Sequence, residues 1–86
     1  MRKLVYFHVS YCGPCRSMLE KTIKPLKAEY PERVEIVDAM CAGEKLNEYS
    51  VGDKMPLTIV TNDEGECWRH EGVCDALQLI DILNGA

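Results

Sequence analysis

The sequence predicts an α/β fold: a four-stranded mixed sheet with helices against it, built in the order β-α-β-α-β-β-α. An apolar run over residues 4–9 precedes a segment, 16–30, whose apolar residues recur at helical spacing. Two more strand-like runs, 34–38 and 55–60, each follow a helical stretch. A turn sequence over 62–65 then leads to a fourth strand. These observations indicate a strand-helix-strand unit followed by a hairpin and a closing helix.

The first half of the chain is predicted to form a strand, a helix and a second strand. Residues 3–9 form the first strand, whose apolar character is typical of a central strand covered on both faces. The helix that follows spans 13–30, and Pro25 lies inside it. Because proline removes a helical hydrogen bond, we expect a kink or a break near 21–22. The strand 34–38 should lie parallel to the first, through a right-handed crossover.

The second half supplies the other two strands and the last helix. Residues 40–50 form a weak helix, and 55–60 form the third strand, which a proline can open because its missing N–H falls at the strand edge. The turn 62–65 returns the chain as an antiparallel strand over 66–70. Apolar residues at helical spacing over 73–83 mark the closing helix.

Composition limits the classes of protein to which the chain can belong. Its 86 residues, 47% of them hydrophobic, suit a single domain over residues 1–86 and are too few for two. A net charge of -4 offers no basic surface to attract nucleic acid. No apolar run reaches the length of a signal-peptide core or a membrane span. We therefore expect a monomeric cytoplasmic protein with neither a nucleic-acid nor a membrane partner.

The cysteines give the strongest functional signal. Their number, five, is odd, so they cannot all pair within one chain, and in a reducing compartment most would be free thiols. Cys12 and Cys15 lie where the first strand meets the first helix. If that helix begins near Gly13, both side chains lie on one face, with Cα atoms within the roughly 4.4–6.8 Å that a disulfide needs. The spacing predicts a redox-active pair.

The two cysteines are expected to have different roles. Free N–H groups and the helix dipole stabilise a thiolate at the helix start and lower its pKa below the ~8.5 of a free cysteine, which makes Cys12 the nucleophile. Cys15, one turn further in and more buried, would stay a thiol until it attacks the mixed disulfide formed on Cys12. Between them, Gly13 lets a substrate approach the backbone, and Pro14 presets φ for the helix start.

This pattern resembles the thioredoxin family over almost the whole chain. Cys12-Gly13-Pro14-Cys15 matches the family's active-site tetrad, Met55-Pro56 falls where the family has a cis-proline facing the cysteines, and Gly72 follows the fourth strand. The resemblance implies a thioredoxin fold and an enzyme, a thiol-disulfide oxidoreductase, that reduces protein disulfides without a bound cofactor. Its reductant would be a thioredoxin reductase. The implied substrate-binding residues around the catalytic pair are Tyr11, Gly13, Pro14, Met55, Pro56 and Gly72.

Three features depart from the thioredoxin pattern. The chain starts at the active-site strand, without the leading strand and helix of a full thioredoxin, and so has the size of a glutaredoxin. Tyr11 replaces the tryptophan that usually precedes the first cysteine. Tyr6 falls where thioredoxins have a buried aspartate, and a tyrosine cannot act as a base near neutral pH. Glu35 or Asp38 on the adjacent strand, or water, could take the proton of Cys15 instead.

A second resemblance lies near the end of the chain. Residues 72–75, Gly-Val-Cys-Asp, are similar to the stretch with which glutaredoxins hold a carboxylate of glutathione. The match is partial, because the proline and aromatic residue that glutaredoxins have between their cysteines, and the Thr-Val before their cis-proline, are both absent. A glutathione-coupled oxidoreductase is therefore the alternative among enzymes.

The remaining cysteines admit an alternative of another class, a redox-inert metal-binding or docking module. Because the carboxyl ends of parallel strands meet at one edge of a sheet, we expect Cys41 and Cys74 at the Cys12 end and Cys67 at the opposite end. Ligand types for zinc are present in Cys12, Cys15, Cys41 and Cys74 with His8 or His70, but the sequence has no second closely spaced pair. We therefore expect no metal.

Overall fold

The computed structural model describes residues 1–85 and has the predicted order of elements. They are β1 (Lys3–His8), α1 (Gly13–Met18), a π-helical segment η1 (Leu19–Ile23), α2 (Lys24–Glu29), β2 (Val34–Asp38), α3 (Gly43–Glu48), β3 (Leu57–Asn62), β4 (Gly65–Glu71) and α4 (Ala76–Leu83). The strands lie in the order β2-β1-β3-β4. Because β1 is parallel to β2 while β3 is antiparallel to both of its neighbours, the predicted mixed sheet is confirmed.

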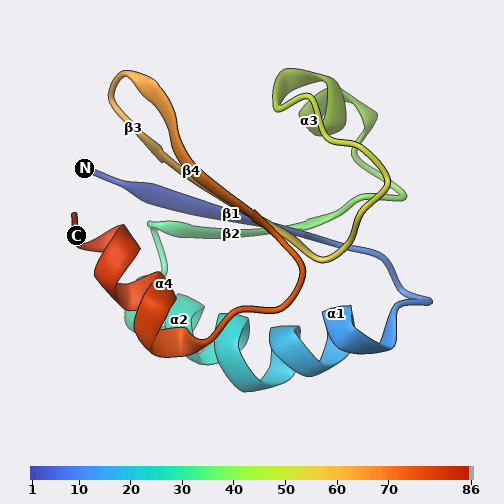
Figure 1. Ribbon diagram of the computed structural model, residues 1–86, viewed down its shortest axis with the longest axis horizontal. Helices are drawn as coiled ribbons and strands as arrows, with labels where there is room; N and C mark the ends of the chain where they lie inside the picture. The colour runs from blue at the N-terminus through green and yellow to red at the C-terminus, as the bar shows by residue number, and fades with distance from the viewer. Residues whose placement is uncertain (86) are drawn as a thin grey trace.

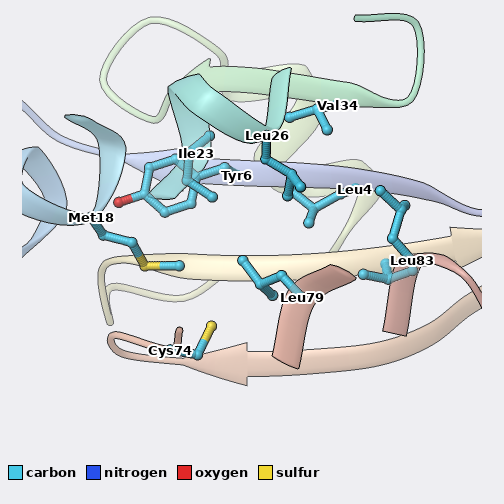
Figure 2. Close-up of a cluster of buried hydrophobic side chains, with 10 residues drawn as sticks. Leu4, Tyr6, Met18, Ile23, Leu26, Val34, Cys74, Leu79 and Leu83 are labelled. Atoms are coloured by element: carbon cyan, nitrogen blue, oxygen red, sulfur yellow. The ribbon is translucent and has the colours of Figure 1, made fainter. Parts of the chain in front are cut away.

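Helices cover both faces of the sheet. Figure 1 shows α1, α2 and α4 against one face and α3 against the other. Within β1, the side chains of Leu4 and Tyr6 join the cluster under α1, α2 and α4, which Figure 2 shows, and those of Val5 and Phe7 join the cluster under α3. All four are at most 3% exposed. The first strand is therefore central, as predicted, and it ends at His8, one residue earlier than expected.

The long first helix is interrupted where Pro25 predicts an interruption. Between α1 and α2 the backbone forms the π-helical segment η1, which contains the expected positions 21–22. At its end, the N–H of Lys24 donates to the carbonyl of Leu19, five residues back. Proline has no N–H to complete the α-helical pattern, and the wider turn accommodates this loss without separating the two helices.

Both remaining helices are shorter than predicted. The helix expected over 40–50 is the six-residue α3, because the chain after β2 first makes a turn in which the N–H of Met40 donates to Asp38 Oδ1 at 2.9 Å. The last helix begins later than expected because Asp75 is its N-cap. The Asp75 side chain accepts a hydrogen bond from the N–H of Gln78 at 2.8 Å, which satisfies a free donor of the first turn.

The hairpin is tighter than the sequence suggests. The strand expected over 55–60 forms later, as β3, since Pro56 cannot donate to the ladder. Asn62 then pairs with Gly65, so that residues 63–64 alone make the turn. Both strands of the hairpin therefore extend further toward the turn than expected, because the turn uses fewer residues than the predicted range 62–65.

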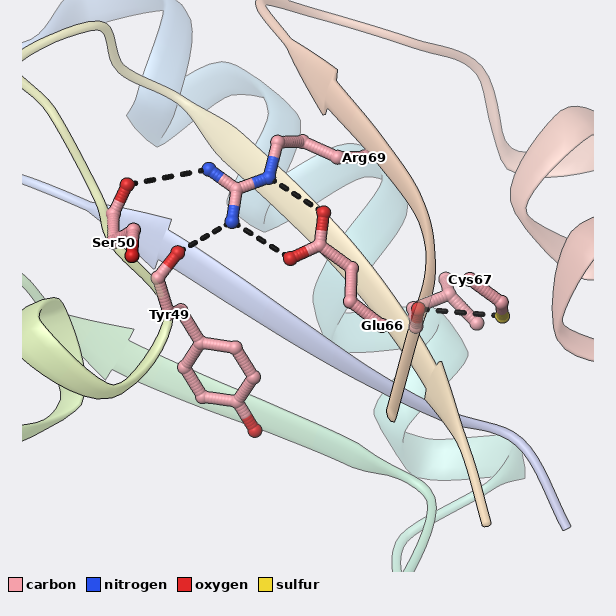
Figure 3. Close-up of polar contacts among 6 residues, drawn as sticks. Tyr49, Ser50, Glu66, Cys67 and Arg69 are labelled. Atoms are coloured by element: carbon pink, nitrogen blue, oxygen red, sulfur yellow. Dashed lines mark hydrogen bonds and ion pairs between the residues drawn. The ribbon is translucent and has the colours of Figure 1, made fainter. Parts of the chain in front are cut away.

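An arginine on β4 holds the end of α3. The guanidinium of Arg69 donates to the carbonyl oxygens of Tyr49 and Ser50, the latter at 3.5 Å, and pairs with Glu66 at 2.7 Å (Figure 3). The hydrogen bond from Arg69 lowers the pKa of the Glu66 carboxyl. These contacts satisfy carbonyl groups that the helix end leaves without intrahelical donors.

Ser50 is expected to be a site where glycine stabilises the protein. It has φ of 52°, in the left-handed region, and the N–H of Val51 bonds back to the carbonyl of Leu46 at 2.8 Å. Glycine adopts this conformation without steric cost, so Ser50→Gly should raise the free energy of unfolding by about 0.5–1 kcal/mol. Ser17→Gly, inside α1, should lower it by a similar amount. Urea unfolding checks both, and shifts of the same sign would contradict this prediction.

Candidate active site

Cys12 lies between β1 and α1 and Cys15 lies in α1, and their sulfurs form a disulfide with Cα atoms 5.2 Å apart. Cys12 is the N-cap of α1: its backbone is extended, and its sulfur accepts a hydrogen bond from the N–H of Cys15 at 3.2 Å. Cys15 is fully buried, whereas Cys12 is half-buried. The predicted disulfide and the predicted difference in exposure are both confirmed.

The turn that carries the disulfide is exposed. Tyr11, just before Cys12, is 77% exposed, and both Gly13 and Pro14 are open to solvent. A Cβ added at Gly13 would meet no atom within 4 Å among the described residues, so the packing of those residues does not require glycine there. Pro14 lies in the first turn of α1, where its missing N–H costs no helical bond. The turn is thus open to an approaching molecule.

Two further predicted site residues come together at the same end of the sheet. The Met55–Pro56 peptide bond is cis, as the family resemblance implied. Gly72, with φ of 102°, donates its N–H to the carbonyl of Pro56 at 2.7 Å. The strand register places Phe7 beside Leu57, so Pro56 and Gly72 lie at the end of β1 that leads to Cys12. The sheet therefore gathers these segments at one edge.

Two exposed apolar residues at this edge were not predicted. Met40 follows β2 and is 63% exposed, and Val73 follows Gly72 and is 58% exposed. The hydroxyl of Ser10 lies 4.0 Å from the sulfur of Met40, which links the loop after β2 to the loop before Cys12. With Tyr11, they form what we call the apolar rim: Tyr11, Met40 and Val73. The sequence could have indicated these residues, because each one follows a strand that ends at this edge of the sheet.

Tyr6 lies beneath the disulfide. Its ring is fully buried, and its hydroxyl donates to the carbonyl oxygen of Cys15 at 2.8 Å. Burial raises the pKa of Tyr6 to about 12, and the nearby Cys74 adds to the shift. The hydroxyl therefore stays protonated at neutral pH, as expected for a residue that cannot replace an aspartate as a base.

The two carboxylates considered as substitutes project on different faces of the sheet. Glu35 is paired with Val5 in the sheet register and so projects on the α3 face, where it pairs with Lys45 at 3.3 Å. That face is opposite the one that holds Cys15 and Tyr6, so the structure corrects the suggestion that Glu35 could serve as the base. Asp38 pairs with His8 and so lies on the Tyr6 face, but it is exposed at the end of β2 and accepts a hydrogen bond from the N–H of Met40.

The other cysteines occupy the ends of the sheet that the topology predicts. Cys41 is exposed in the turn after β2, and Cys74 is buried in the cluster that also contains Tyr6 (Figure 2). Burial raises the pKa of the Cys74 thiol. Cys67, toward the hairpin end of β4, donates its thiol to the carbonyl of Val60 at 3.3 Å (Figure 3). Within residues 1–85 no three His, Cys, Asp or Glu side chains are grouped to hold a metal ion.

The helices are too short to span a membrane. Over residues 1–85, no helix has both the length and the apolar character needed to cross a bilayer.

Stability should fall at alkaline pH because of two groups buried near the disulfide. Both Tyr6 and Cys74 have pKa values that burial raises above those of the unfolded chain. Their contribution to stability is complete below the unfolded pKa values, about 8.5 for Cys and about 10 for Tyr, and is lost as pH rises toward the folded ones. We expect the free energy of unfolding of the oxidised protein to decline above about pH 9. Urea denaturation at a series of pH values should show that the free energy of unfolding declines less steeply in Tyr6→Phe and in Cys74→Ala than in wild type. A decline as steep as that of wild type in both variants would contradict this prediction.

The comparisons with known proteins agree with this geometry. The thioredoxin family model matches residues 1–85. A thioredoxin from Fasciola hepatica is 30% identical, with a TM-score of 0.78 over 96% of this chain and 78% of that one. A point mutant of a thioredoxin from Halobacterium salinarum is 24% identical, with a TM-score of 0.81 over 96% of this chain and 72% of its own. Thioredoxin 1 from Thermosipho africanus is 22% identical, with a TM-score of 0.75 over 95% and 90%.

A comparison with curated protein sequences finds no match. The family model nevertheless spans nearly the whole chain, and the fold and the disulfide agree with it. The chain therefore belongs to the thioredoxin family, and it is a thiol-disulfide oxidoreductase whose redox-active group is the Cys12–Cys15 disulfide.

Proposed function

We propose that this protein reduces protein disulfides, with Cys12 as the nucleophile and Cys15 as the resolving thiol. The observation that carries this assignment is the unequal exposure of the pair: Cys15 is fully buried under the turn, and Cys12 is not. A partner's disulfide can therefore reach Cys12 first, and Cys15 can react only with a sulfur already bonded to Cys12.

The exchange takes place in two balanced steps. The Cys12 thiolate, stabilised by the N–H of Cys15, attacks one sulfur of the partner's disulfide; a mixed disulfide forms, and the partner's other sulfur leaves as a thiolate that takes up a proton. Cys15 then gives its proton to water or to a leaving thiolate and attacks Cys12. The Cys12–Cys15 bond forms, the mixed disulfide breaks, and two electrons have passed to the partner.

Substrate recognition is proposed to use main-chain bonds and contacts with the exposed turn around the disulfide. Met55 is half-buried and precedes the buried Pro56, whose carbonyl is already occupied by Gly72. An extended substrate segment could pair with the backbone of Met55 while Tyr11, Gly13 and Pro14 contact it near the disulfide. Such recognition would tolerate many sequences. Slowed exchange of the Met55 amide proton in a trapped complex would support it, and unchanged exchange would count against it.

We propose a thioredoxin reductase, supplied by NADPH, as the electron donor. The glutaredoxin-like stretch 72–75 gives less support to glutathione, because the side chain of Cys74 is buried in the core and that of Asp75 caps α4. The N–H of Gly72 is likewise bonded to Pro56. A cytoplasmic location is proposed from the free thiols of Cys41, Cys67 and Cys74, which suit a reducing compartment.

Insulin reduction tests the proposed function and its electron donor together. We expect turnover with NADPH and a thioredoxin reductase, and little with glutathione, glutathione reductase and NADPH. The reverse result would transfer the assignment to a glutathione-coupled enzyme. If insulin is reduced with neither enzyme system, and not with dithiothreitol as the electron source either, the proposal that the protein reduces disulfides is contradicted.

A further inference from the structure

The hydroxyl of Tyr6 joins the centre of the sheet to the active-site helix. Tyr6 is in β1 and Cys15 is in α1, and the hydroxyl donates to the Cys15 carbonyl at 2.8 Å in a buried environment. The tyrosine ring is itself held, because it is fully buried and stacks on His8 with ring centres 5.9 Å apart. A rigid side chain thus fixes the backbone of one of the two reacting residues.

The helical N–H donor to the Cys15 carbonyl is shared with a second acceptor. The N–H of Leu19, at the end of α1, is shared between the carbonyls of Cys15 and Arg16, at the point where the chain passes into η1. A shared donor makes a poorer bond with each acceptor. Tyr6 supplies the Cys15 carbonyl with a second donor where the helical pattern changes.

One titratable side chain, His8, stacks on the Tyr6 ring, and two further polar side chains lie nearby. Thr58 lies beside Tyr6 on β3, and its side chain is fully buried. Cys74 is a further neighbour, and burial disfavours its thiolate. Since the pKa of Tyr6 is raised to about 12, its hydroxyl is a donor throughout the working pH range. Tyr6 can therefore hold Cys15 but cannot take its proton.

We propose that Tyr6 is a positioning residue for the resolving step: by holding the Cys15 carbonyl, it keeps the Cys15 sulfur directed at Cys12. The step is the second one of the proposed function, on which this inference rests. Cys15 attacks Cys12, the Cys12–Cys15 bond forms, and the partner's sulfur leaves with the electron pair of the broken bond. Tyr6 exchanges no proton or electron in it. Its contribution is orientation, to which the rate of an intramolecular attack is sensitive.

Tyr6→Phe tests this role because it removes the hydroxyl and leaves the ring. Stopped-flow mixing of the reduced protein with a fluorescent disulfide peptide separates attack by Cys12 from release of the peptide by Cys15. We expect attack within about twofold of wild type and release about threefold to tenfold slower, the range that one net hydrogen bond implies. The mixed disulfide should accumulate accordingly. Tyr30→Phe, a half-buried tyrosine at the end of α2, is the matched control and should change neither rate.

The pH profile distinguishes positioning from proton transfer. Because the hydroxyl is protonated from about pH 6 to about pH 9, the slowing in Tyr6→Phe should be the same factor throughout this range. The inference would be overturned if Tyr6→Phe released the peptide at the wild-type rate, or if attack and release were slowed equally. A slowing factor that changed with pH would overturn it too. If wild type shows no attack by Cys12 at all, the proposed function fails instead.

A measurement on the wild-type protein covers the case in which Tyr6→Phe does not fold. The hydroxyl proton of a persistently bonded, buried tyrosine exchanges slowly with water and can be observed by NMR. We expect such a proton on Tyr6 in both the oxidised and the reduced protein. Fast exchange in the reduced protein, the form that resolves mixed disulfides, would overturn the role assigned to Tyr6.

Discussion

Replacing Cys12 with serine is expected to abolish disulfide exchange, whereas replacing Cys15 with serine should leave the first attack intact and trap the partner on Cys12. The reason is the position of the two residues on α1. Cys12 caps the helix with its sulfur facing an N–H donor, and Cys15 is fully buried. Loss of the nucleophile should reduce the rate by more than about a thousandfold. Loss of the resolving thiol removes only the second step.

Non-reducing gels and peptide mapping measure this asymmetry. In the Cys15→Ser protein, a mixed disulfide with a target protein should accumulate on Cys12 and disappear with dithiothreitol. Cys41→Ser is the matched control, since it removes an exposed thiol outside the pair and should preserve turnover. Mixed disulfides on Cys15 in the Cys12→Ser protein, or equal alkylation of both reduced thiols by a bulky reagent, would contradict the assignment.

Phe7→Ala should remove much of the stability of the fold. Phe7 is fully buried in β1, under α3, and meets Tyr49 edge to face with ring centres 5.8 Å apart. Truncating a buried phenylalanine costs about 3–5 kcal/mol, because apolar burial is lost and a cavity remains. Domains of this size are stable by only about 5–15 kcal/mol, so this single change is large.

Urea unfolding of the oxidised protein, followed by circular dichroism, measures the loss. Leu77→Ala is the control, because Leu77 is 75% exposed on α4 and its truncation should change the free energy of unfolding by less than about 0.5 kcal/mol. A loss below about 1 kcal/mol for Phe7→Ala would show that the cluster under α3 contributes little to stability. An unfolded Phe7→Ala protein with a folded control agrees with the prediction.

Local features of the site were predictable because few residues determine them. Three-residue spacing at a helix start brings Cys12 and Cys15 within bonding distance in any fold. Pro25 likewise predicts an interruption four residues upstream, since the missing N–H would have bonded there, and η1 occupies that place. The form of the interruption, a π-helical turn, could not be predicted, because a proline is compatible with a kink, a break or a wider turn.

Features that depend on pairing between distant segments were not predictable. Glu35 was considered as a base for Cys15, but the register that pairs it with Val5 turns it to the α3 face, and alternation within one strand does not reveal that register. The bond from Tyr6 to the Cys15 carbonyl was missed for a related reason. It joins a strand to a helix in another layer, and no spacing rule connects a tyrosine hydroxyl with a backbone carbonyl.

The reduction potential of the Cys12–Cys15 pair tests most directly the claim that this protein donates electrons to protein disulfides. The protein is equilibrated in dithiothreitol buffers of graded potential, and the fraction of reduced pair is read from the mass added by an alkylating reagent. Cys41→Ser, Cys67→Ser and Cys74→Ser, combined in one protein, restrict the signal to the pair. A reductant should have a potential near that of thioredoxin, about -270 mV. A potential near about -120 mV, that of a strong oxidant, would contradict the proposed direction of electron flow.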